Sequence, residues 1–112
     1  HAYVEHLPWH ECVRRYDRPH TLFYMDPPYW KTEGYGVPFL FEEYERMAEV
    51  LRSMQGRAVV SLNDHADIRR CFAGFHIETL YHKYSVARDA ATTAKEILIF
   101  SWDPAVEPAA LF

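Results

Sequence analysis

Cysteine, glycine and positive charge are all scarce in this sequence. Cys12 and Cys71 are its only cysteines, too few for a disulfide scaffold and too far apart for a CxxC metal pair. Isolated thiols are typical of a reducing compartment, so we expect a cytoplasmic protein. The seven histidines lack the spacing of metal ligands, and we therefore predict no metal site.

Two further absences narrow the class of protein. The 112 residues carry a net charge of −4, whereas a protein that binds nucleic acid unaided is usually basic on its binding face. If this chain meets DNA, most of the phosphate-binding charge must lie elsewhere. No apolar run approaches the ~18 residues of a membrane helix, so we expect no membrane partner.

What is present is material for one packed domain, since 49% of the residues are hydrophobic and 16% are aromatic. Periodicity predicts strands at 2–5, 21–25, 58–62, 75–86 and 95–102, and helices at 9–16 and 41–54. A third helix should begin at an N-cap, Asp64, and stop at Gly74. Residues 103–112 should form a tail after a domain of residues 1–102.

This order of elements predicts an α/β fold with a mostly parallel sheet and right-handed crossovers. The last two strands have no helix between them, so they should form an antiparallel pair. Residues 21–25 are a continuous apolar run, typical of a strand buried on both faces. Ligands of such sheets bind beyond the carboxyl ends of the strands, and Asp26 stands at one of these ends.

The tetrapeptide Asp26-Pro27-Pro28-Tyr29 combines groups that could activate an exocyclic base amine. Such an amine is a poor nucleophile because its lone pair is delocalised into the ring, and two acceptors that bind its two hydrogens draw the lone pair out of that conjugation. The Asp26 carboxylate is one acceptor, and the Pro27 carbonyl, held by two prolines that fix φ and lack N–H donors, is the other. Tyr29 offers a flat face for a base flipped out of its duplex. A plain turn is the simpler reading, but this tetrapeptide arises by chance in about 1 of 2,000 such chains.

With these residues in place, the sequence resembles the Dam-like N6-adenine DNA methyltransferases, particularly the prophage-type members. The resemblance covers roughly residues 3 to 101. The matching segments are Val4-Glu5-His6-Leu7-Pro8-Trp9, Arg15-Tyr16-Asp17-Arg18-Pro19-His20 continuing to Trp30, Phe41-Glu42-Glu43-Tyr44-Glu45, Ser61-Leu62-Asn63-Asp64, Tyr84-Ser85-Val86 and Lys95-Glu96-Ile97-Leu98-Ile99.

The resemblance implies the catalytic half of a Rossmann-like methyltransferase sheet that transfers a methyl group from S-adenosylmethionine to adenine in double-stranded DNA. It implies that Asp26 and the Pro27 carbonyl bind the target amine, that Pro28 belongs to the same catalytic motif, that Tyr29 stacks on the flipped adenine, and that Asp26 lies against the cofactor. Trp9 stands where the family contacts the cofactor adenine, although the acid expected beside it is replaced by Pro8.

Other residues have weaker assignments. Ser61 and Asn63 follow a neighbouring strand end and could line the base pocket, although capping of the next helix is the stronger reading. Lys31 could meet a phosphate. The family's glycine-rich cofactor loop is missing from the sequence, so we expect a fragment that needs an N-terminal half for tight cofactor binding. Methylation of an RNA amine and an inactive prophage remnant are the alternatives.

Overall fold

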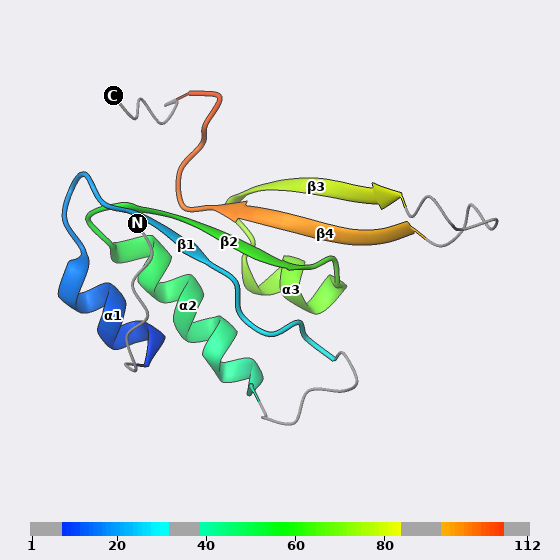
Figure 1. Cartoon of the computed structure of the whole chain (residues 1–112), viewed down its shortest axis with the longest axis horizontal. Helices are drawn as coiled ribbons and strands as arrows, with labels where there is room; N and C mark the ends of the chain where they lie inside the picture. The colour runs from blue at the N-terminus through cyan, green and yellow to red at the C-terminus, as the bar shows by residue number, and fades with distance from the viewer. Residues whose placement is uncertain (1–7, 32–38, 84–92, 107–112) are drawn as a thin grey trace.

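The computed structural model describes residues 8–31, 39–83 and 93–106. The elements in chain order are α1 (Trp9–Tyr16), β1 (Leu22–Met25), α2 (Phe41–Ser53), β2 (Arg57–Asn63), α3 (Ala66–Cys71), β3 (His76–Lys83) and β4 (Thr93–Phe100) (Figure 1). The predicted helices and the strands that fall in these ranges are confirmed to within a few residues. The strand predicted at 2–5 lies outside the described residues.

The four strands form one mixed sheet in the order β1-β2-β4-β3. β1 pairs with β2 in parallel, and β4 is antiparallel to both β2 and β3. The predicted antiparallel pair at the end of the chain is confirmed. The prediction of a mostly parallel sheet is wrong, because only one of the three strand pairs is parallel. β2 and β3 run in the same direction, but the antiparallel β4 lies between them.

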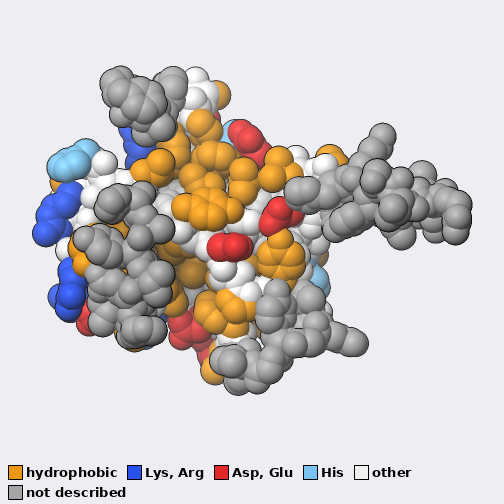
Figure 2. Space-filling model, in the orientation of Figure 1, with side chains coloured by type: hydrophobic (Ala, Val, Ile, Leu, Met, Phe, Trp, Pro, Cys, Tyr) orange, Lys and Arg blue, Asp and Glu red, His pale blue; other side chains and the backbone are white. Residues whose placement is uncertain are grey.

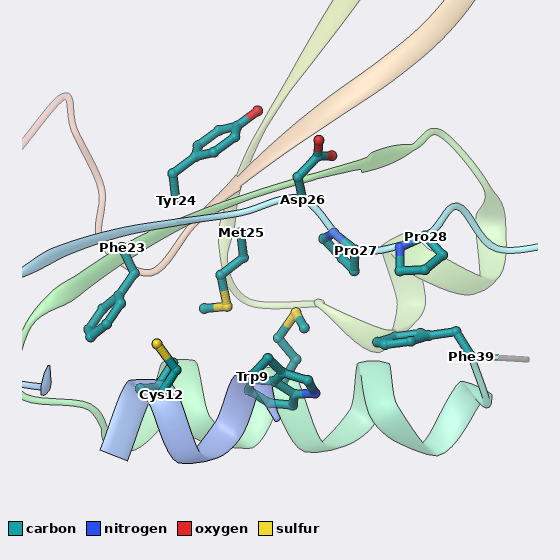
Figure 3. A pocket seen from close by; sticks show the side chains of 11 residues that line it. Trp9, Cys12, Phe23, Tyr24, Met25, Asp26, Pro27, Pro28 and Phe39 are labelled. Atoms are coloured by element: carbon teal, nitrogen blue, oxygen red, sulfur yellow. The ribbon is translucent and has the colours of Figure 1, made fainter. Parts of the chain in front are cut away.

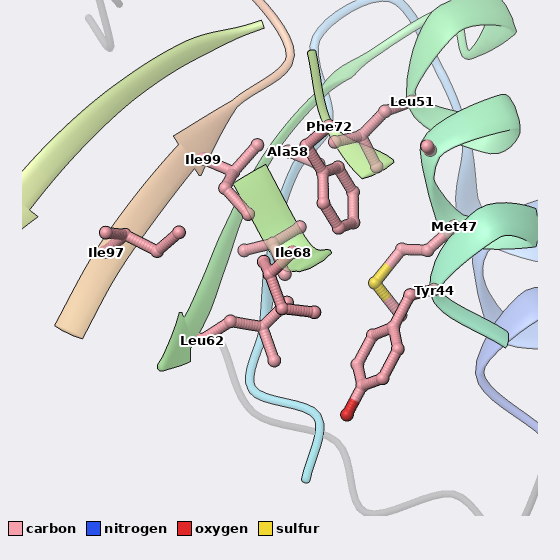
Figure 4. Packing of buried hydrophobic residues seen from close by; sticks show 11 residues of the cluster. Tyr44, Met47, Leu51, Ala58, Leu62, Ile68, Phe72, Ile97 and Ile99 are labelled. Atoms are coloured by element: carbon pink, nitrogen blue, oxygen red, sulfur yellow. The ribbon is translucent and has the colours of Figure 1, made fainter. Parts of the chain in front are cut away.

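The core lies between the sheet and the helices. β2 alternates, so that Ala58, Val60 and Leu62 all face α2 and α3, as expected for a strand with a side-chain period of two. Figure 4 shows this packing, to which the other elements contribute buried residues. They are Tyr44, Met47, Ala48, Leu51, Ile68, Phe72, Ile97 and Ile99. Burial of these apolar side chains is the main force that holds the sheet and helices together.

The register places the other face of the sheet away from the described helices. Leu22 and Tyr24 of β1 alternate with the core-facing Phe23 and are 47% and 66% exposed. Two-sided burial of β1 was therefore a wrong prediction for the described chain. β1 is also an edge strand of the described sheet. Figure 2 shows hydrophobic side chains gathered over the middle of the molecule, with acidic side chains among them.

One helix start also differs from the prediction. The N-cap of α3 is His65 rather than Asp64, and the His65 Nδ1 atom accepts a hydrogen bond from the Asp67 main-chain N–H at 3.0 Å. Asp64 instead forms an ion pair with Arg69, its Oδ1 atom lying 2.7 Å from Nε. Asp64 and His65 are adjacent in the turn before α3, and either side chain can accept a hydrogen bond at a helix start. The sequence pattern therefore could not tell which of the two is the N-cap.

Candidate functional site

The tetrapeptide lies at the carboxyl end of β1, on the rim of the sheet where β2 also ends and β4 begins. Met25 pairs with Val60 in the parallel ladder, and Asn63 pairs with Glu96 across β2 and β4. Asp26 is exposed and follows β1 directly. The rim thus gathers side chains from three strands that are far apart in the sequence, in the place where open α/β sheets bind ligands.

Asp26 and its neighbours are divided between the two faces of β1. Figure 3 shows Tyr24 and Asp26 pointing away from the helices, whereas Phe23 and Met25 point toward Trp9 and Cys12 of α1. A pocket of about 360 Å³ lies on the helix side, and Trp9, Asp26, Pro27 and Pro28 are all among the residues that line it. The structure therefore brings Trp9 and Asp26 to one pocket, but the Asp26 carboxylate is directed to the opposite side.

Tyr29 is fixed at its hydroxyl. The phenol O–H donates to Oε2 of Glu96 in β4. The same carboxylate oxygen accepts from the Ser61 hydroxyl at 2.8 Å. Ser61 is only 2% exposed, so it lies behind the rim and contacts Glu96 rather than lining an open pocket.

The main chain after the prolines is held by two further side chains. Asn63 donates from Nδ2 to the Trp30 carbonyl at 3.0 Å and accepts from the Trp30 N–H at Oδ1, at 2.9 Å. The buried Tyr44 donates its hydroxyl to the carbonyl of Pro28. The Pro28 carbonyl is thus engaged by Tyr44. The carbonyl that we predict to accept a hydrogen bond from the target amine is that of Pro27.

Trp30 ends the supported segment. Its indole N–H donates to Asp67 Oδ2 at 3.0 Å, and this hydrogen bond is the main reason that the pKa of the Asp67 carboxyl lies below its ordinary value. The ring also packs on Phe41 of α2, with 5.0 Å between the ring centroids. Residues 28–30 are consequently connected by side chains to α2, β2, α3 and β4.

The two remaining predicted site residues are accounted for by local contacts. The Trp9 indole N–H donates to Glu43 Oε1 at 2.9 Å, which fixes the ring on the pocket wall. Lys31 is exposed and adopts a positive φ of 60°, and its Nζ atom lies 5.7 Å from the centroid of the Trp30 ring. A cation over an indole face is a favourable arrangement, and it leaves the ammonium group accessible to solvent.

Sequence reasoning assigned no role to Glu96, Tyr44 or Asp67, which all contact the tetrapeptide or Trp30. Glu96 lies in β4, directly before the apolar run from Ile97 to Phe100. An acidic residue beside such a run is the signal that could have identified it. Tyr44 and Asp67 sit on helix faces where tyrosine and aspartate are ordinary residues, so the sequence held no comparable signal for them.

Comparison with known proteins leaves the family open: the sequence matches no protein-family model and has no significant match among curated proteins. Among the described residues, no group of three or more histidine, cysteine or acidic side chains is arranged to hold a metal ion. The helices at 9–16, 41–53 and 66–71 are all too short or too polar to cross a membrane.

Proposed function

We propose that this chain forms the base-gripping part of an adenine-specific DNA methyltransferase with a Rossmann-like catalytic sheet. One observation carries the proposal. An exposed carboxylate, Asp26, follows β1 and is followed at once by Pro27 and Pro28, in a segment whose Pro28 carbonyl and Trp30 main chain are hydrogen-bonded by side chains. Rigid placement of polar groups is what distinguishes a reactive site from a turn of similar composition.

In the proposed reaction, the chain acts on the N6 amine of a flipped adenine. The Asp26 carboxylate accepts one N–H of the amine and the Pro27 carbonyl accepts the other, which turns the nitrogen lone pair out of the ring. The Tyr29 ring supports the base by stacking, a contact worth roughly 1–3 kcal/mol. Transfer of the methyl group would break its bond to the cofactor sulfur, which would keep the electron pair and leave as S-adenosylhomocysteine. The amine would lose one proton, and we assign its acceptance to the Asp26 carboxylate.

The residues present suit part of S-adenosylmethionine. When bound, the cofactor would supply a methyl group on a positively charged sulfur, and the Asp26 carboxylate, although directed away from the pocket beside Trp9 (Figure 3), would favour a cation at the rim. The apolar pocket beside Trp9, at about 360 Å³, falls in the size range of small-molecule sites. We assign the contacts to the rest of the cofactor to the N-terminal half of the same enzyme, the partner that the resemblance implies.

The charge of the rim also fits an amine better than a phosphate. Asp26 and Glu96 bring two carboxylates to this end of the sheet, whereas the exposed Arg14, Arg15 and Arg18 lie on and after α1. In Figure 2 the basic side chains gather at the left of the molecule, away from the acidic ones in the centre. Apart from Lys31, whose exposed ammonium group lies beside Trp30, phosphate contacts are therefore expected from other surfaces than the rim.

Methyl transfer from tritiated S-adenosylmethionine tests the proposal. The natural polypeptide that carries this chain is incubated with unmethylated duplex DNA and, separately, with RNA, and the products are digested to nucleosides. The proposal predicts label in N6-methyldeoxyadenosine. Label only in RNA would support the RNA enzyme instead, and no label in either substrate would support the inactive remnant.

A further inference from the structure

We propose that Glu96 is a positioning residue, which sets the orientation of the Tyr29 ring before the base arrives. This inference rests on the proposed function, because it assigns a purpose to the ring of Tyr29. It adds a residue from the last strand of the described sheet, 67 positions along the chain from Tyr29, to the site formed at the end of β1.

The topology explains how Glu96 reaches this site. β4 runs antiparallel to β2, so the beginning of β4 lies beside the end of β2, and Glu96 pairs with Asn63. Ser61 lies two residues earlier on β2 and therefore on the same face. Its hydroxyl donates a hydrogen bond to Oε2 of Glu96 at 2.8 Å. The Glu96 carboxylate is thus oriented by a residue of the sheet, and it also accepts the hydrogen bond from the Tyr29 hydroxyl.

Tyr29 is consequently held at both ends. Tyr44 and Asn63 fix the main chain on either side of it, at Pro28 and Trp30, and Glu96 fixes the hydroxyl. A tyrosine on a loop otherwise loses rotamer freedom when a ligand binds, and that loss weakens binding. Because the ring is already ordered, less of the stacking energy is spent on immobilising it.

The double variant distinguishes action through the Tyr29 hydroxyl from a purely structural role of Glu96. If Glu96 acts through the Tyr29 hydroxyl, then Tyr29→Phe, which keeps the ring but removes the hydroxyl, already abolishes its contribution. Adding Glu96→Ala should then change little, since contacting residues that work through one interaction are not additive. Independent roles would instead multiply the two effects.

The experiment measures kcat/KM for methylation of unmethylated duplex DNA by the natural polypeptide and five variants, each normalised to folded protein. We expect Tyr29→Phe and Glu96→Ala each to lower kcat/KM about tenfold, the scale of one hydrogen bond to a charged group. The double variant should also lie about tenfold below the wild type.

Glu96→Gln, which keeps a weaker acceptor, should lose only about threefold and serves if Glu96→Ala does not fold. Glu78→Ala, on the neighbouring strand β3, is the matched control and should match the wild type.

Two results would overturn the inference without touching the proposed function. One is full activity of both Glu96 variants in an active enzyme. The other is a double variant roughly a hundredfold below the wild type, the product of the single effects. A wild type that methylates no DNA would refute the proposed function itself, and the role of Glu96 would fall with it.

Discussion

The Asn63 side chain is joined to the main chain of Trp30 by a pair of hydrogen bonds, one from the Trp30 N–H at 2.9 Å and one to its carbonyl at 3.0 Å. The carboxamide therefore takes the place that a neighbouring strand would take, just beyond the last pair of β1 and β2. A segment with two prolines cannot extend the ladder, because proline has no N–H to donate, and Asn63 supplies the pairing from a side chain.

Asn63→Ala should therefore loosen the segment that follows the prolines. Losing both hydrogen bonds is expected to lower the free energy of unfolding by about 1–2 kcal/mol, since the Trp30 main-chain groups are left partly buried without this partner. Urea unfolding followed by tryptophan fluorescence measures the loss. Ser53→Ala is the control, because its exposed hydroxyl donates only within α2, and it should change stability little. Equal stability of the two variants would show that Asn63 does not support the segment.

Gly56 marks a second point where the chain is tightly packed. A Cβ atom there would lie 2.4 Å from the Thr21 carbonyl oxygen and 2.7 Å from that of Arg18. These are main-chain atoms that cannot rotate away, and the Gly56 N–H also donates to Asp17 Oδ1 at 2.7 Å. Gly56→Ala should lower the free energy of unfolding by about 2 kcal/mol or more.

Gly74→Ala provides the comparison for that variant. Gly74 has a φ of +96° but open space where a Cβ would be placed, so alanine meets strain in the backbone without a collision. Its expected cost is about 1 kcal/mol. Thermal unfolding of the two variants side by side checks the order, and a Gly56→Ala protein as stable as Gly74→Ala would contradict the packing described here.

Cys71 is expected to be a slow nucleophile near neutral pH. Burial raises the pKa of its thiol to about 11, with a smaller contribution from the negative charge of Glu45. Because the raised pKa means that folding favours the protonated thiol, the stability linked to this group is present below about pH 9 and is lost as the pH rises toward 11. Alkylation by iodoacetamide, read at Cys71 by mass spectrometry, should keep accelerating as the pH rises to about 11, whereas the rate at an ordinary thiol levels off at about pH 9. Rapid modification of the folded chain at pH 7 would contradict this.

The sequence predicted most of the elements because their signals are local. The spacing of Trp9, Cys12, Val13 and Tyr16 predicted α1 from one helical face, and the acid-rich start and Gly56 bracketed α2. The burial of β1, by contrast, depends on residues that are distant in the sequence. An apolar strand sequence does not say which faces are covered, and the exposure of Tyr24 depends on elements that pack beside the sheet.

The candidate site divides in the same way. Asp26, Pro27, Pro28 and Tyr29 could be identified because the chemistry is contained in four consecutive residues. The attachment of Tyr29 to Glu96 could not, since it depends on β4 inserting beside β2 after a crossover of the chain. Sequence separation gives no register for such a pair, and only the assembled sheet shows that the two side chains meet.

Replacement of Asp26 tests the central claim most directly. Its carboxylate is exposed, so Asp26→Ala should fold as the wild type does, with an unchanged midpoint of thermal unfolding. Incorporation of tritiated methyl groups into unmethylated duplex DNA by the natural polypeptide should fall by at least about a hundredfold, with Asp103→Ala, another exposed acid, as the control. Normal methylation by a folded Asp26→Ala protein would contradict the account.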